Sequence, residues 1–189
     1  MNSAATKMST KTLVVSALLT AIGILIPIIM QPPFKILIEP MSFTLASHVP
    51  VMIAMFVSPV SACIVAIGTA LGFLLSGMPL VIAVRALSHI IFALVGAWMI
   101  CSGKAKFSNF WSLVILAVVT GVLHGAFEMI SILPFYFGGA LAEGFYKTGF
   151  LYSVLGLVGF GTVIHSWIDF ILSVLIVKAL KRANVFIIK

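Results

Sequence analysis

Long apolar stretches separated by short polar breaks dominate this 189-residue chain and constrain its fold more than any other feature. Hydrophobic residues make up 62% of the sequence and charged residues only 8%, which is more apolar side chain than a soluble domain of this length can bury. A membrane-spanning helix needs about 20 mostly apolar residues. We therefore predict an all-α integral membrane protein, a single domain over residues 1–189 that forms a compact bundle of six transmembrane helices near 12–30, 41–57, 60–76, 79–101, 109–137 and 157–181.

The second and third segments are shorter than the others and only a few residues separate them. Pro50 lies inside the second segment, so we expect a tilt, a kink or a partial span there. The first segment is long for the apolar core of a signal peptide and is not followed by a small-residue cleavage site, so we expect it to remain as a helix.

The net charge of +7 is explained by membrane orientation. With the N-terminus in the cytoplasm, inside segments hold eight basic residues and outside segments two, which satisfies the positive-inside rule. We therefore predict a multi-pass protein of the cell membrane with both termini cytoplasmic, and no binding to nucleic acid. The inside residues are Lys7, Lys11, Lys104, Lys106, Lys178, Lys181, Arg182 and Lys189, and the outside residues are Lys35 and Lys147.

Charged and imidazole side chains occur as pairs inside the apolar segments. Residues spaced i, i+4 share one helix face, and counting from the predicted outer ends places these pairs, together with His48, at similar depths in the outer part of the membrane. Such a polar layer suits a solute pocket that opens to the outside, because intramembrane charges are usually functional. The pairs are Arg85 with His89, His124 with Glu128, and His165 with Asp169.

The same layer also has a structural interpretation. Arg85 needs a counter-charge, which Glu128, Asp169 or a bound anion can supply, and a buried ion pair can simply fix helix register. Each histidine can likewise satisfy itself through an interhelical hydrogen bond.

Motifs for catalysis are missing from the sequence. The chain has no G-x-x-x-x-G-K-[ST] loop for ATP, no H-E-x-x-H motif and no G-x-S-x-G motif, and Cys63 and Cys101 form no CxxC pair. We expect no catalytic residues, no cofactor and no metal site, and therefore a binding subunit that other proteins energise.

Small residues on the first helix indicate a partner. Ala17 and Ala21 stand one turn apart and would let another helix approach closely, either within the bundle or from a separate subunit. With this motif, the stretches "SFTLASHVPV", "RALSHIIFALVGA" and "GFGTVIHSWIDF" resemble the substrate-binding S components of energy-coupling factor vitamin transporters, most closely the niacin-specific branch. The resemblance covers nearly the whole chain.

The resemblance implies an S-component fold that captures a vitamin on the outer face, with "QPPFKILIEP" as a lid between the first two helices. It also implies a transmembrane coupling subunit and two ATP-binding subunits as partners, with Ala17 and Ala21 as the docking face.

For nicotinate, a small aromatic carboxylate, we assign one arginine to the carboxylate and aromatic walls to the ring. The expected site comprises Arg85 for the carboxylate, His48, His89 and His165 for hydrogen bonds, Trp167 or Tyr146 for stacking, and Glu128 and Asp169 as orienting residues.

Three alternatives stay open from the sequence. Pantothenate or another carboxylated vitamin would use the same arginine. The histidines and acids could instead serve transport of a divalent metal, although a metal site disfavours a cation such as Arg85 in its layer. A membrane enzyme would need an assembled nucleophile, which the sequence does not show.

Overall fold

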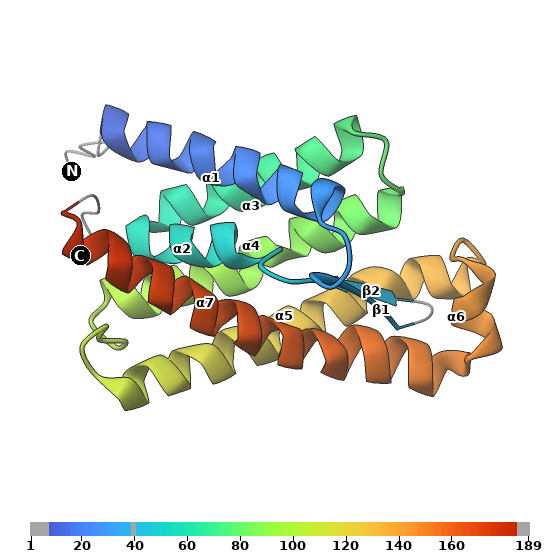
Figure 1. Cartoon of the computed structure of the whole chain (residues 1–189). Helices are drawn as coiled ribbons and strands as arrows, with labels where there is room; N and C mark the ends of the chain where they lie inside the picture. Colours follow the sequence, from blue (N-terminus) through green and yellow to red (C-terminus); the bar gives the residue numbers. More distant parts are fainter. Residues whose placement is uncertain (1–7, 39–40, 185–189) are drawn as a thin grey trace, which may run out of the picture.

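The computed structural model describes residues 8–38 and 41–184 as a bundle of antiparallel helices with one small hairpin (Figure 1). Lys7 and Lys189, and the end of the predicted lid at Glu39 and Pro40, lie outside the described residues. The elements are α1 (Thr10–Ile29), β1 (Lys35–Ile38), β2 (Met41–Thr44), α2 (Val49–Val57), α3 (Pro59–Leu75), α4 (Leu80–Cys101), α5 (Phe110–Phe137), α6 (Glu143–Lys147), the π-helical segment η1 (Leu151–Gly161) and α7 (Thr162–Arg182).

Among the residues that the structure describes, four helical stretches are long and apolar enough to cross a membrane. They are α1, α4, α5 and the continuous stretch of η1 and α7, and α3 is a shorter apolar helix of 17 residues. The beginning of α1, the end of α7 and the turn between α4 and α5 lie at one end of the bundle in Figure 1, and α6 lies at the other. The all-α membrane architecture is therefore confirmed.

Helix α2 forms the centre of the core. Every residue from Val49 to Phe56 is buried, as expected for a helix that is apolar on all sides and packed inside protein. Its nine residues extend about 14 Å, less than half of a hydrocarbon core of about 30 Å. The second predicted segment is thus a half-length helix.

The predicted helix over 41–57 is wrong for its first eight residues. Residues 41–44 form β2, which pairs antiparallel with β1 from Lys35↔Thr44 to Ile38↔Met41. Ala46 has a positive φ of 65°, which a helix does not admit. Pro50 lies in the first turn of α2, where its missing N–H and fixed φ favour a helix start, so it marks a boundary and not a kink.

The last predicted helix, over 157–181, begins too late. The structure continues it back through η1 to Leu151 and adds the short α6 before it. Gly156, Gly159 and Gly161 have low helix propensity and argue against a helix here, but packing against α5 overrides this low propensity. A Cβ added at Gly125 of α5 would lie 2.6 Å from the carbonyl oxygen of Gly159, so the two backbones are in direct contact.

Candidate ligand-binding site

Glu128 of α5 organises one half of the polar layer. Its Oε2 accepts hydrogen bonds from Arg85 Nη2 at 2.6 Å and from Thr162 Oγ1 at 2.9 Å, and its Oε1 accepts one from His89 Nε2 at 3.1 Å. Glu128 is only 3% exposed. The counter-charge that Arg85 needs is therefore Glu128, and helices α4, α5 and α7 meet at this carboxylate.

Asp169 of α7 organises the other half by holding the segment before α2. Its Oδ1 accepts from the backbone N–H of Ala46 at 2.8 Å, and its Oδ2 accepts from the backbone N–H of His48 at 2.9 Å and from His48 Nδ1 at 3.1 Å. A carboxylate only accepts hydrogen bonds, so Nδ1 of His48 carries a proton. In the neutral ring, Nε2 of His48 then has a free lone pair.

Asp169→Asn is expected to destabilise the protein by about 1.5 to 3 kcal/mol, the range for a hydrogen bond to a charged group, because the amide introduces N–H donors where three donors already converge. Thermal unfolding in detergent measures this effect. Ser166→Ala is the matched control on α7, since within the described chain the buried Ser166 hydroxyl has no hydrogen-bond partner and its loss should leave the melting temperature unchanged. Equal melting temperatures for the two variants would show that Asp169 does not anchor this segment.

A cavity of about 160 Å³ adjoins the Glu128 half of the layer. Arg85 forms part of its wall and has donors to spare: Nη1 makes only a 3.5 Å contact with Met41 Sδ, and the buried Nε has no partner among the described residues. The polar lining residues are Lys35, Thr44, Ser47, Thr69, Arg85, His89 and Glu128, and apolar residues that include Pro50, Phe73 and Ile82 complete the wall.

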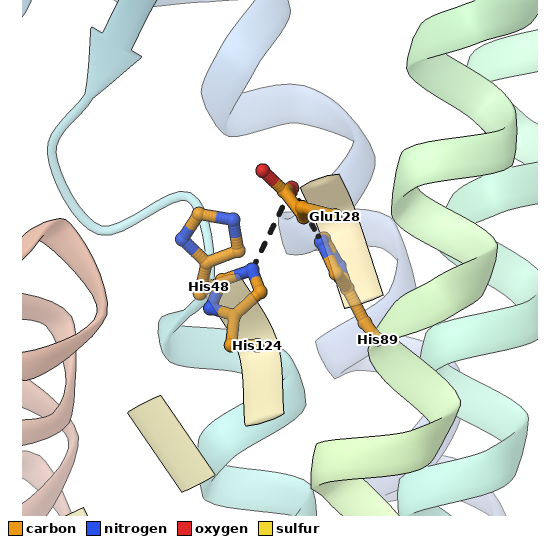
Figure 2. A group of neighbouring side chains, drawn as sticks. All are labelled: His48, His89, His124 and Glu128. Carbon is orange, nitrogen blue, oxygen red and sulfur yellow. Dashed lines mark hydrogen bonds and ion pairs between the residues drawn. The ribbon is translucent and has the colours of Figure 1, made fainter. Parts of the chain in front are cut away.

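The four histidines form a compact cluster around His48. Its ring centroid lies 5.0 Å from that of His89, 4.4 Å from that of His124 and 5.0 Å from that of His165. Figure 2 shows His48, His89 and His124 turned toward Glu128. Of the four, only His89 lines the cavity. Ser47, which also lines it, hydrogen-bonds His48 Nδ1 at 3.2 Å and His165 Nε2 at 3.1 Å.

Both aromatic residues expected to stack on a ligand lie away from this cavity. Trp167 is 38% exposed, and its indole N–H donates to the backbone carbonyl of Ala117 on α5. It stands two positions from His165 and Asp169, which is about 200° around a helix. Tyr146 packs on Tyr136, where its hydroxyl donates to that residue's carbonyl. Neither residue lines the cavity beside Arg85.

The small residues of α1 serve two different faces. Ser16 and Gly23 are buried against α3, where Ser16 Oγ hydrogen-bonds Ser61 Oγ at 2.7 Å. Ala17 and Ala21 are exposed. Packing within the bundle therefore does not explain the alanine pair.

Sequence comparison identifies the family of this chain. The chain is 38% identical over 177 residues to the niacin transporter NiaX of Lactococcus lactis subsp. cremoris (strain MG1363), and the match covers 94% of this chain and 78% of the relative. The chain belongs to the S components of energy-coupling factor transporters. No family model and no solved structure matches it. The resemblance predicted from the sequence is confirmed, and this S component has a role in membrane transport.

Sequence reasoning missed Thr162, Ala46 and the cavity-lining residues Lys35, Thr44, Ser47 and Thr69. Thr162 stands one turn before Ser166 on the face of α7 that carries Asp169, so helical periodicity could have indicated it. Ala46 contributes only its backbone N–H, and no side-chain pattern reveals such a contact.

Proposed function

We propose that this S component captures niacin, as nicotinate, in the cavity beside Arg85 and delivers it to a shared energy-coupling module. The observation that supports this most is the guanidinium of Arg85, which binds Glu128 through one nitrogen, keeps an unpaired Nε–H among the described residues and lines a ring-sized cavity. A carboxylate matches the planar fork of an arginine. The similarity to a niacin transporter points to the same ligand.

Cavity size favours a single-ring ligand. An engineered cavity of about 150 Å³ in another protein binds benzene, and the cavity here measures about 160 Å³. Nicotinate is one six-membered ring with one carboxylate. Pantothenate carries the carboxylate on a flexible chain, which does not suit this compact shape.

Each polar group then has a role. Arg85 binds the carboxylate, His89 hydrogen-bonds the ligand, and Glu128 orients both through its two oxygens. Asp169 positions His48 through the backbone N–H of that residue. His165 hydrogen-bonds the hydroxyl of Ser47, which lines the cavity. Trp167 and Tyr146 are not included, because they lie elsewhere.

The proposed topology keeps six membrane-embedded segments in one domain, with α2 as the half-length member. Lys104 and Lys106 lie in the turn between α4 and α5, at the end of the bundle where α1 begins and α7 finishes (Figure 1), and the positive-inside rule places this end in the cytoplasm. The hairpin of β1 and β2 then lies on the outer side. It contributes Lys35 and Thr44 to the cavity, as a lid would.

The proposed partners are a transmembrane coupling subunit and two ATP-binding subunits. The support is the exposed alanine pair of α1, which offers a close-approach surface that the bundle itself leaves free.

Binding of radiolabelled nicotinate to the purified chain tests the proposed function. We expect one saturable site per chain, with unlabelled nicotinate as the best competitor, nicotinamide weaker and pantothenate without effect. Nicotinamide lacks the charge that Arg85 recognises. Displacement by pantothenate at lower concentration than by nicotinate would assign the site to another carboxylated vitamin.

A further inference from the structure

Four side chains converge on one point at the centre of the bundle. His48, His89, His124 and Glu128 each place one ligand atom within 4.8 Å of the others (Figure 2). In a tetrahedral zinc site with bonds of about 2.0 to 2.1 Å, ligand atoms lie roughly 3.3 Å apart. Small side-chain rotations would close the difference. The four residues come from α4, α5 and the start of α2, so the helices already hold them in place.

His124 supplies an independent observation. It is 1% exposed, and neither ring nitrogen has a hydrogen-bond partner in the described residues; Nε2 lies 3.6 Å from Glu128 Oε1. A buried polar group without a partner is costly and calls for a physical explanation such as an ion. An ion that accepts the lone pair of Nε2 would provide a partner for one of these two nitrogens.

The neighbours of His48 and Glu128 orient these two residues as metal ligands are usually oriented. His48 donates from Nδ1 to Asp169 and so presents the lone pair of Nε2. Arg85 and Thr162 occupy Oε2 of Glu128, and Oε1 accepts a hydrogen bond from His89 Nε2. Metal binding replaces this hydrogen bond: the proton of His89 moves from Nε2 to Nδ1, and Nε2 and Oε1 then both bind the ion. Carboxylates that hold ligating histidines, and hydrogen bonds that hold ligating carboxylates, are the common outer shell of metal sites.

The charge of the layer also favours a cation. With neutral histidines, Arg85 contributes one positive charge against two negative charges from Glu128 and Asp169, so the buried layer carries a net charge of −1. A divalent ion changes this to +1, and an anionic vitamin would then make it neutral. Lys35 is half-buried in the cavity wall on β1 and is not part of the layer. Arg85 therefore does not exclude a metal, because Glu128 offsets its charge.

We propose that His48, His89, His124 and Oε1 of Glu128 bind a divalent transition-metal ion of the zinc class that stays with the protein. Three imidazoles and one carboxylate oxygen suit Zn²⁺, and Co²⁺ binds similar sites. The other convergent group, His48, His165 and Asp169, is a weaker site because Asp169 already accepts two backbone hydrogen bonds. This proposal does not depend on which vitamin the protein binds.

The test uses the full chain, purified in detergent through a tag without histidine, stripped with a chelator and then titrated with Zn²⁺ or Co²⁺ in the absence of any vitamin. We expect one equivalent per chain by elemental analysis, and for Co²⁺ the intense visible absorption of tetrahedral coordination. His124→Gln should lower the affinity by more than the roughly 10- to 100-fold typical of outer-shell changes. His165→Gln is the matched control and should retain both the stoichiometry and the spectrum.

Several results would overturn the proposal. These are the absence of stoichiometric metal in the wild-type chain, unchanged affinity in His124→Gln, or an equal loss in His165→Gln, which would assign the ion to the group around Asp169. Uptake of radioactive metal by cells that express the complete transporter would show that the ion is a transported substrate and does not stay bound to the protein. If His124→Gln does not fold, His48→Gln at the half-buried start of α2 replaces it. Nicotinate binding is measured separately, so failure here leaves the proposed vitamin untouched.

Discussion

Arg85→Ala is expected to remove most of the affinity for nicotinate and to leave the affinity for uncharged nicotinamide largely unchanged. The variant deletes the cation that is anchored on Glu128 and leaves Lys35 as the other cation of the cavity wall, while the cavity itself remains. Arg85→Lys keeps the charge but loses the planar fork, and should weaken nicotinate binding by about 1 to 3 kcal/mol. Equilibrium binding of both ligands to folded protein provides the measurement.

The buried pair of Arg85 and Glu128 requires a control. Removing one partner of a buried ion pair leaves the other uncompensated, at a cost of about 3 to 5 kcal/mol of stability, so Arg85→Ala should be examined together with Arg85→Ala/Glu128→Gln. If the double variant restores both folding and nicotinate affinity, the arginine is structural. A loss confined to nicotinate in both variants supports the carboxylate role, and an equal loss for both ligands contradicts it.

Replacing Ala17 and Ala21 together by tryptophan is expected to abolish vitamin uptake by the complete transporter while the isolated chain still binds vitamin. Both alanines are exposed on α1 and do not contact the cavity. A close helix crossing cannot admit two indole rings. Co-purification of the chain with the coupling subunit, and uptake in cells, measure the effect.

Leu18→Trp with Ile22→Trp is the matched control. These residues have the same spacing on the same helix and are 58% and 46% exposed, but they point about 100° away from the alanine pair. The control should assemble and transport normally. If it fails as completely as the alanine variant, bulk anywhere on α1 is harmful and the alanine pair is no specific docking face. If vitamin binding is lost while assembly persists, docking on this face is wrong.

Periodicity explains how much of the site could be predicted. The i, i+4 pairs of Arg85 with His89, and of His165 with Asp169, fix which side chains share a helix face, so the sequence could indicate that they would meet. The same rule separates Trp167 from its two neighbours by about 200°. Helical spacing therefore already argued against stacking by Trp167. In the structure its indole N–H donates to the Ala117 carbonyl of α5, away from the cavity.

Other features depended on contacts between distant segments. Residues 41–48 are apolar enough for a helix, but pairing with β1 and capture of Ala46 and His48 by Asp169, more than 120 residues away, hold them in another conformation. The glycines of η1 would end an isolated helix. Direct backbone packing against Gly125 retains it.

The sequence by itself determined the membrane class, the position of most helices and the residue types of the polar layer, because apolar length and helical spacing are local properties of a chain. The tertiary structure decided which carboxylate pairs with Arg85, which histidine nitrogens are left free, and which face of α1 is available to a partner. Those outcomes depend on distances of a few ångströms between helices that are far apart in sequence. Side-chain hydrogen bonding and coordination are decided at that scale.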